Sequence, residues 1–175
     1  MSPRNVGRLI ALAIVLAVLG ILEFTTKHNG RTTFTPANVS INPGKGWRSI
    51  EMPADPPACS PQLSSRDGII NAVVLDSDVT DLQGAVDKLQ AAFAANDQAV
   101  KDSFKQEPFT TDSGLAGIHI SYSAHSAKDG PADVHTHSFV SHNMYKRFFS
   151  ISYITSPETE SPAVIQAIQK SMRVE

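Results

Sequence analysis

The chain has 175 residues, of which 41% are hydrophobic and 18% charged, and its formal net charge is −2. This composition is ordinary for a globular protein and has room for one domain with a hydrophobic core. No basic patch with interleaved aromatic residues is present, which excludes a typical nucleic-acid surface, so we expect no nucleic-acid partner.

The first 24 residues have the layout of a membrane-targeting segment. Arg4 and Arg8 precede an uncharged apolar run, Leu9 to Leu22, and this order is typical of an export signal. As a helix the run would rise roughly 21 Å, less than the roughly 30 Å of a bilayer core, so a signal peptide competes with a signal anchor. We favour a single-pass anchor in the inner or cytoplasmic membrane, because the end of the run offers a poor cleavage site. The arginines then place the domain outside the cytoplasm. Cleavage would instead leave a secreted or periplasmic domain.

Residues 25–38 are polar, contain Gly30 and Pro36 and show no periodicity, so they predict a flexible tether. The folded domain is then expected over residues 39–175. Its first strands are predicted at residues 39–41, 47–52 and 68–77, because β-branched and apolar residues there are bounded by turn residues.

Residues 53–61 are rich in proline and predict a loop, since proline cannot donate a hydrogen bond to a sheet. The single cysteine, Cys59, lies in this loop. It has no cysteine to pair with, and a proline-rich loop gives a nucleophile no fixed oxyanion donors, so we do not expect Cys59 to be catalytic.

A helix is predicted after the third strand. Apolar residues recur every three or four positions from Leu82 to Phe93, and Asp78 or Thr80 can cap the helix. The pattern allows it to continue as far as Phe104, before Pro108.

The last third of the chain is rich in predicted strands, and residues 117–125 alternate between apolar and polar residues. Strands are predicted at residues 117–125, 133–141 and 145–155, and a closing helix follows, with Ser161 as its cap and Pro162 in its first turn. Strands in hairpin succession with two separate helices indicate an α+β fold, in which helices sandwich an antiparallel β-sheet.

The order of these elements, Gly46-Trp47 near the start, "SGLAGIHISYSA" and "FFSISYITSPETESPAVIQAIQKSM" resemble the PsbP-like family over roughly residues 39–173. Members of that family include extrinsic lumenal proteins of photosystem II and many bacterial exported or anchored proteins. The resemblance implies an antiparallel sheet between helices, no catalytic machinery in most members, and a role in binding proteins or ions.

The stretch "DVHTHSFVSHN", residues 133–143, contains three of the six histidines. On a strand, residues two apart point to the same side about 6.5 to 7 Å from each other, so His135 and His137 can reach one cation. Asp133 lies on the same side, and His119 is expected on the outer face of a neighbouring strand. These four residues form a candidate site for zinc or another divalent metal, whose bound water could act in hydrolysis. The alternative is a polar strand face that is open to water.

We therefore expect a membrane-anchored or exported accessory domain that is not an enzyme, needs no cofactor and acts on another protein or complex. The alternative is a metal-binding protein or zinc-dependent hydrolase that uses His135 and His137.

Overall fold

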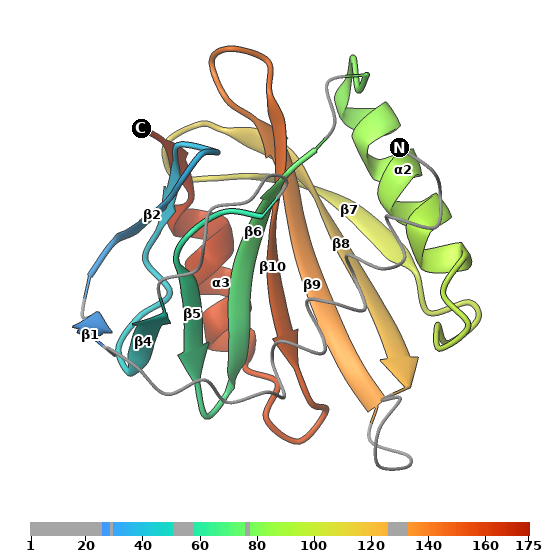
Figure 1. Cartoon of the computed structure of the whole chain (residues 1–175), viewed down its shortest axis with the longest axis horizontal. Coiled ribbons are helices and arrows are strands. Elements are labelled where there is room, and N and C mark those ends of the chain that lie inside the picture. The colour runs from blue at the N-terminus through green and yellow to red at the C-terminus, as the bar shows by residue number, and fades with distance from the viewer. Residues whose placement is uncertain (1–25, 29, 51–57, 76–77, 126–132) are drawn as a thin grey trace.

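The computed structural model describes residues 26–28, 30–50, 58–75, 78–125 and 133–175. Within them, the main element is an eight-stranded sheet whose pairings are all antiparallel (Figure 1). In spatial order its strands are β1 (Thr26–His28), β4 (Trp47–Ile50), β5 (Gln62–Ser65), β6 (Gly68–Val74), β10 (Phe148–Thr155), β9 (Asp133–His142), β8 (Ala116–His125) and β7 (Lys105–Thr110). A smaller sheet has the order β11 (Arg173–Val174), β3 (Val39–Ile41) and β2 (Thr32–Phe34).

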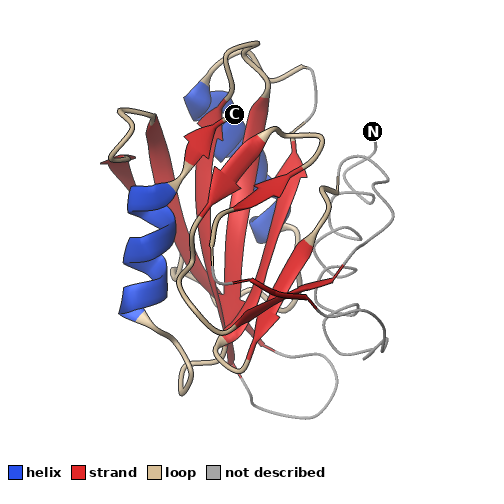
Figure 2. Cartoon of the chain, turned by 90° about the vertical axis from the view of Figure 1, so that its left-hand side faces the viewer, coloured by secondary structure: helices blue, strands red, loops and turns tan. Residues whose placement is uncertain are grey.

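Two helices, α2 (Leu82–Ala94) and α3 (Pro162–Ser171), cover the large sheet, and the side view in Figure 2 shows both against the strands. The two helices cover opposite faces of the large sheet. Neighbouring residues of β9 show this, because successive side chains on a strand point to alternate faces. Phe139 belongs to the core that includes Ile168 of α3, whereas Val140 belongs to the core that includes Val86 of α2. Both faces of this part of the sheet are therefore covered, and the predicted α+β class with an antiparallel sheet and two helices is confirmed.

Helix α2 is shorter than the sequence pattern allows. Its cap is Asp81, whose side chain accepts a hydrogen bond of 2.7 Å from the backbone N–H of Gly84, so the prediction of Asp78 or Thr80 is wrong. The helix ends at Ala94 and does not continue to Phe104. The residues that follow turn into β7, which lies at the edge of the sheet. Pro108 fits there, because one side of an edge strand needs no N–H donors.

The structure corrects the tether predicted for residues 25–38. Strands β1 and β2 both lie in that range, and Phe34 and Ala37 are 0% and 1% exposed. Arg31 fixes the segment further, because its guanidinium donates a 2.7 Å hydrogen bond to the carbonyl of Ser171 in α3. The domain boundary predicted at residue 39 therefore falls too late, since apolar burial holds the preceding residues in the core.

Two other stretches also differ from the prediction. Cys59 lies in the core at 4% exposure, and its N–H donates to the carbonyl of Ala72, so the end of the proline-rich stretch is part of the packed domain. The third strand of the last group begins at Phe148, and Tyr145 lies in the preceding turn.

The predicted N-terminal apolar helix, Leu9 to Leu22, lies outside the described residues. Among the residues that are described, no helix is both long enough and apolar enough to span a bilayer.

Candidate functional site

The candidate site lies where β7, β8 and β9 run side by side (Figure 1), on the face that includes Phe139 and packs towards α3. The strand register places His119 of β8 between Glu107 of β7 and Phe139 of β9. His137 of β9 is opposite Tyr153 of β10. Because residues two apart on a strand share a face, this register brings His119 and His137 together diagonally.

Five side chains form one chain of hydrogen bonds, which we name the histidine–glutamate network. Glu107 Oε1 lies 2.8 Å from His119 Nδ1, and His119 Nε2 lies 3.1 Å from His137 Nδ1. His137 Nε2 then lies 3.1 Å from Glu160 Oε1. The other oxygen of Glu160, Oε2, lies 2.5 Å from His135 Nδ1. Glu160 immediately precedes the cap of α3 and joins the helix to β9 through both histidines.

The middle of this network is buried. His119 and His137 are 7% and 8% exposed, so the prediction that His119 lies on a polar outer face is wrong. The physical reason is that its ring stacks on Phe139, with ring centroids 4.7 Å apart and planes 8° from parallel. The end of the network at Glu107 is exposed, whereas Glu160 is about one-quarter exposed. An open, water-facing strand face therefore does not describe these histidines.

The contact between the two buried histidines requires a particular protonation state. An ionised carboxylate only accepts hydrogen bonds, so His119 must donate through Nδ1 to Glu107, and His137 must donate through Nε2 to Glu160. In two neutral imidazoles the remaining nitrogens, Nε2 of His119 and Nδ1 of His137, would both be acceptors. These nitrogens form a hydrogen bond only when the pair holds one additional proton.

Electrostatics assign His137 the acceptor role in that pair. Burial lowers the pKa of His137, the nearby carboxylate of Glu160 opposes this, and His119 lowers the pKa further. Burial alone would raise the pKa of Glu160, but hydrogen bonds and charge from His135 and His137 outweigh it, so that pKa is lowered. Glu160 is therefore favoured as a carboxylate and His137 as a neutral imidazole. Nδ1 of His137 is thus the acceptor in the contact with Nε2 of His119.

The structure brings together three of the four residues predicted as metal ligands. His119, His135 and His137 all belong to the network, but Asp133 does not. Asp133 Oδ1 instead lies 2.7 Å from Nδ1 of His125 across the β8–β9 pair, at the end of the strands. Within the described ranges, no group of three or more histidine, cysteine, aspartate or glutamate side chains is arranged to hold a metal ion.

Sequence reasoning missed the two glutamates. Glu107 could have been found by pairing residues 105–110 with residues 116–121 as a hairpin, since that register sets Glu107 opposite His119. Pro108 makes such a strand hard to recognise from sequence, because proline cannot donate a hydrogen bond to a sheet. Glu160 is 23 residues from His137 along the chain, and no local pattern indicates its position.

Comparisons with known proteins inform the fold alone. No family model matches the chain, and no curated protein matches its sequence. The solution structure of cyanobacterial PsbP (CyanoP) from Synechocystis sp. PCC 6803 matches with a TM-score of 0.57 and 13% identity, over 90% of this chain and 99% of that chain. A crystal structure from Bacteroides thetaiotaomicron VPI-5482 matches with a TM-score of 0.55 and 9% identity, over 85% of this chain and 49% of that chain. This chain thus spans about half the length of the Bacteroides protein. The PsbP-like fold that the sequence resemblance implied is confirmed.

Proposed function

We propose that the chain is an accessory domain without enzymatic activity, placed outside the cytoplasm by its N-terminal apolar run, that acts by binding another protein or complex. The observation that carries this proposal is the likeness to cyanobacterial PsbP over nearly the full length of both chains. The PsbP-like resemblance implies a binding role. Because the match covers 90% of this chain and 99% of that chain, the proposed binding role applies to the whole domain.

The organisation of the histidine–glutamate network supports the same proposal. Its two central imidazoles are buried, and their ring nitrogens form hydrogen bonds with each other and with carboxylates. General acid–base catalysis needs a group that can reach a proton on a bound substrate. In this network His119 and His137 instead join three strands and the segment before α3, which is a structural task.

The test is reciprocal co-purification from the membranes of cells that make the chain. The full chain would carry a tag after Glu175, be crosslinked briefly and be solubilised in mild detergent. We expect one partner to be retained in a fixed ratio and to recover the chain when the partner itself is tagged. Elution of the chain alone, in every detergent that preserves its fold, would refute a binding role.

Divalent metal binding is a second candidate function, favoured by one observation. Glu160 holds its two oxygens against His135 Nδ1 and His137 Nε2, at 2.5 and 3.1 Å. Two imidazoles and a carboxylate are a donor set that zinc accepts. Because the described side chains are not arranged around an ion position, these three would have to shift to bind one. The metal would have to replace the protons in these two hydrogen bonds, so binding would release protons and weaken in acid.

Metal analysis distinguishes this candidate from the first. The full chain would be purified without added metal, analysed by mass spectrometry and titrated with zinc. The His135→Ala/His137→Ala variant should lose stoichiometric zinc if the candidate is correct, whereas His125→Ala, which changes a histidine outside the network, should keep it. A chain that takes up no zinc would exclude both the site and zinc-dependent hydrolysis.

A further inference from the structure

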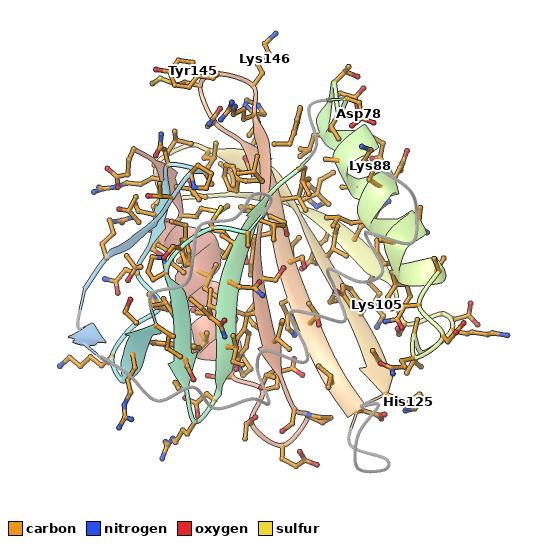
Figure 3. All side chains as sticks on the ribbon, viewed as in Figure 1. Asp78, Lys88, Lys105, His125, Tyr145 and Lys146 are labelled. Atoms are coloured by element: carbon orange, nitrogen blue, oxygen red, sulfur yellow. The ribbon has the colours of Figure 1, made fainter. Side chains whose placement is uncertain are left out.

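The turn between β9 and β10 carries a second candidate surface, far from the histidine–glutamate network. We name residues 142–147 the basic tip. Met144 and Tyr145 in this turn are 72% and 76% exposed, and they are the two large hydrophobic side chains that are exposed among the described residues. Figure 3 shows Tyr145 and Lys146 at the end of the loop that projects beyond the sheet. Isolated exposed apolar residues are ordinary, but two adjacent ones on a projecting turn form a contact point.

Hydrogen bonds of Asn143 fix the conformation of the basic tip. The side chain of Asn143 is buried at 3% exposure, and its Oδ1 accepts 3.0 Å hydrogen bonds from the N–H groups of Tyr145 and Arg147. The backbone N–H of Asn143 also donates to the carbonyl of Arg147. Lys146 has a φ of 55°, a left-handed conformation that the turn imposes. One buried amide thus holds the backbone and leaves Met144 and Tyr145 facing solvent.

The charge of the basic tip restricts what it can contact. Lys146 and Arg147 are both exposed, and residues 142–147 include no acidic residue. The chain as a whole has a formal net charge of −2, whereas the tip is positively charged. Its complement is therefore a negatively charged surface that also accepts apolar side chains.

The size of the tip favours a lipid surface over a protein. A stable protein interface buries about 800 Å² on each partner, which a few side chains at the end of one turn do not supply. A bilayer needs no matching shape. Tyrosine is enriched at the membrane–water interface, and lysine and arginine near an anionic surface gain electrostatic attraction. We propose that the basic tip docks on an anionic phospholipid surface, with Met144 and Tyr145 entering the headgroup region and Lys146 and Arg147 pairing with phosphates.

The test measures the tip itself, because the apolar run Leu9 to Leu22 could attach the full chain to any vesicle. In full-length Tyr145→Trp, indole emission reports the environment at the tip, and Trp47 adds a constant background because it is 2% exposed. Vesicles of phosphatidylcholine alone would be compared with vesicles that also contain phosphatidylglycerol. We expect a shift to shorter wavelength with the anionic vesicles, reversed by added salt because screening weakens exposed charges.

Charge variants in the same background test the role of the cations. Lys146→Asn keeps the turn, because asparagine tolerates a positive φ, and Arg147→Gln leaves the backbone hydrogen bonds intact. Together they should raise the anionic lipid concentration at half-maximal shift by about thirty-fold. Arg66→Gln is the matched control, because it removes an exposed cation from the β5–β6 turn at the opposite end of the sheet (Figure 1). It should leave that concentration unchanged.

Three outcomes would overturn the proposal. One is an emission that neither kind of vesicle changes, which would leave a protein as the occupant of the tip. Another is an equal shift with neutral and anionic vesicles. The third is an equal loss of affinity in the charge variants and in Arg66→Gln, because the effect would then follow total charge and not the tip.

Discussion

Replacing Glu160 by glutamine tests whether the histidine–glutamate network stabilises the fold. The carboxylate of Glu160 accepts hydrogen bonds from both His135 and His137. Glutamine has nearly the same shape, but it carries no charge, and its amide nitrogen can only donate. One of the two imidazoles must therefore change its donor nitrogen into an acceptor or lose its partner.

The expected loss follows from the geometry. A hydrogen bond to a charged group contributes about 1.5–3 kcal/mol, and solvent screening reduces this for a group that is partly exposed. The side chain of Glu160 is 27% exposed, and glutamine can retain one of the two bonds. We therefore expect Glu160→Gln to lower the free energy of unfolding by about 1–3 kcal/mol at neutral pH.

The assay is urea denaturation of the full chain, followed by circular dichroism in one fixed detergent. Glu158→Gln is the matched control, because Glu158 is an exposed carboxylate in the same turn that lies outside the network. It should unfold like the wild type. If Glu160→Gln and Glu158→Gln have the same midpoint and slope, the network makes no measurable contribution and the reasoning is refuted.

The pH dependence supplies an independent check on Glu160. Its folded pKa is lowered, so its stabilising effect is complete above the ordinary glutamate pKa of about 4.3 and is lost as the pH falls through the folded value. The difference between the wild type and Glu160→Gln should therefore shrink in acid. A difference that stays constant down to the acid unfolding transition would show that lost packing, and not lost charge, explains the variant.

Four further predictions follow from the same structure. Phe34→Ala should lower the free energy of unfolding by about 3–5 kcal/mol, whereas Thr33→Ala, exposed in the same strand, should change it by less than about 0.5 kcal/mol. A chain that begins at Val39 should therefore fail to melt cooperatively. Equal stability of Phe34→Ala and Thr33→Ala would instead support a flexible tether at residues 25–38. Because the folded pKa of His137 is lowered, stability should fall as the pH drops below about 6.5, with a smaller slope in His137→Gln; equal slopes would contradict this. Under the accessory-domain proposal a chelator should leave the melting temperature unchanged at neutral pH, and a clear drop would favour the metal candidate. A reporter fused after Glu175 should be active only outside the cytoplasm, and cytoplasmic activity would show that the proposed topology is wrong.

Elements with a strong local pattern could be predicted from the sequence. Helix α3 combines Ser161 before its first turn, Pro162 in it and apolar residues every three or four positions, and all of these are visible within a dozen residues. The sequence of β8 alternates between apolar and polar residues. In contrast, β2 has three residues and depends on pairing with β3, so its evidence is tertiary. Short strands of this kind contain too few positions for periodicity to be read.

The candidate site divides in the same way. The alternate spacing of His135 and His137 correctly indicated that both side chains share a face. Their partner Glu160 could not be found, because its approach depends on where β10 ends and how the chain turns into α3. Asp133 also satisfied the alternate spacing, yet it pairs with His125. Spacing predicts which side chains can meet, whereas strand register and competing partners determine which of them do.

The burial of His119 explains why the network exists in this form. Alternation along β8 suggested one apolar face and one polar face, and that inference assumes that the polar face is open to water. Here α2 covers the face of Ile120, while the opposite face, with His119, belongs to the side that includes Phe139 and α3. A polar side chain on a covered face must find a partner inside the protein, because an unpaired buried polar group costs about 1–3 kcal/mol. Glu107 and His137 supply those partners. The network is thus the consequence of placing histidines on a strand whose two faces are both packed, and its carboxylates complete the hydrogen bonding that water would otherwise provide.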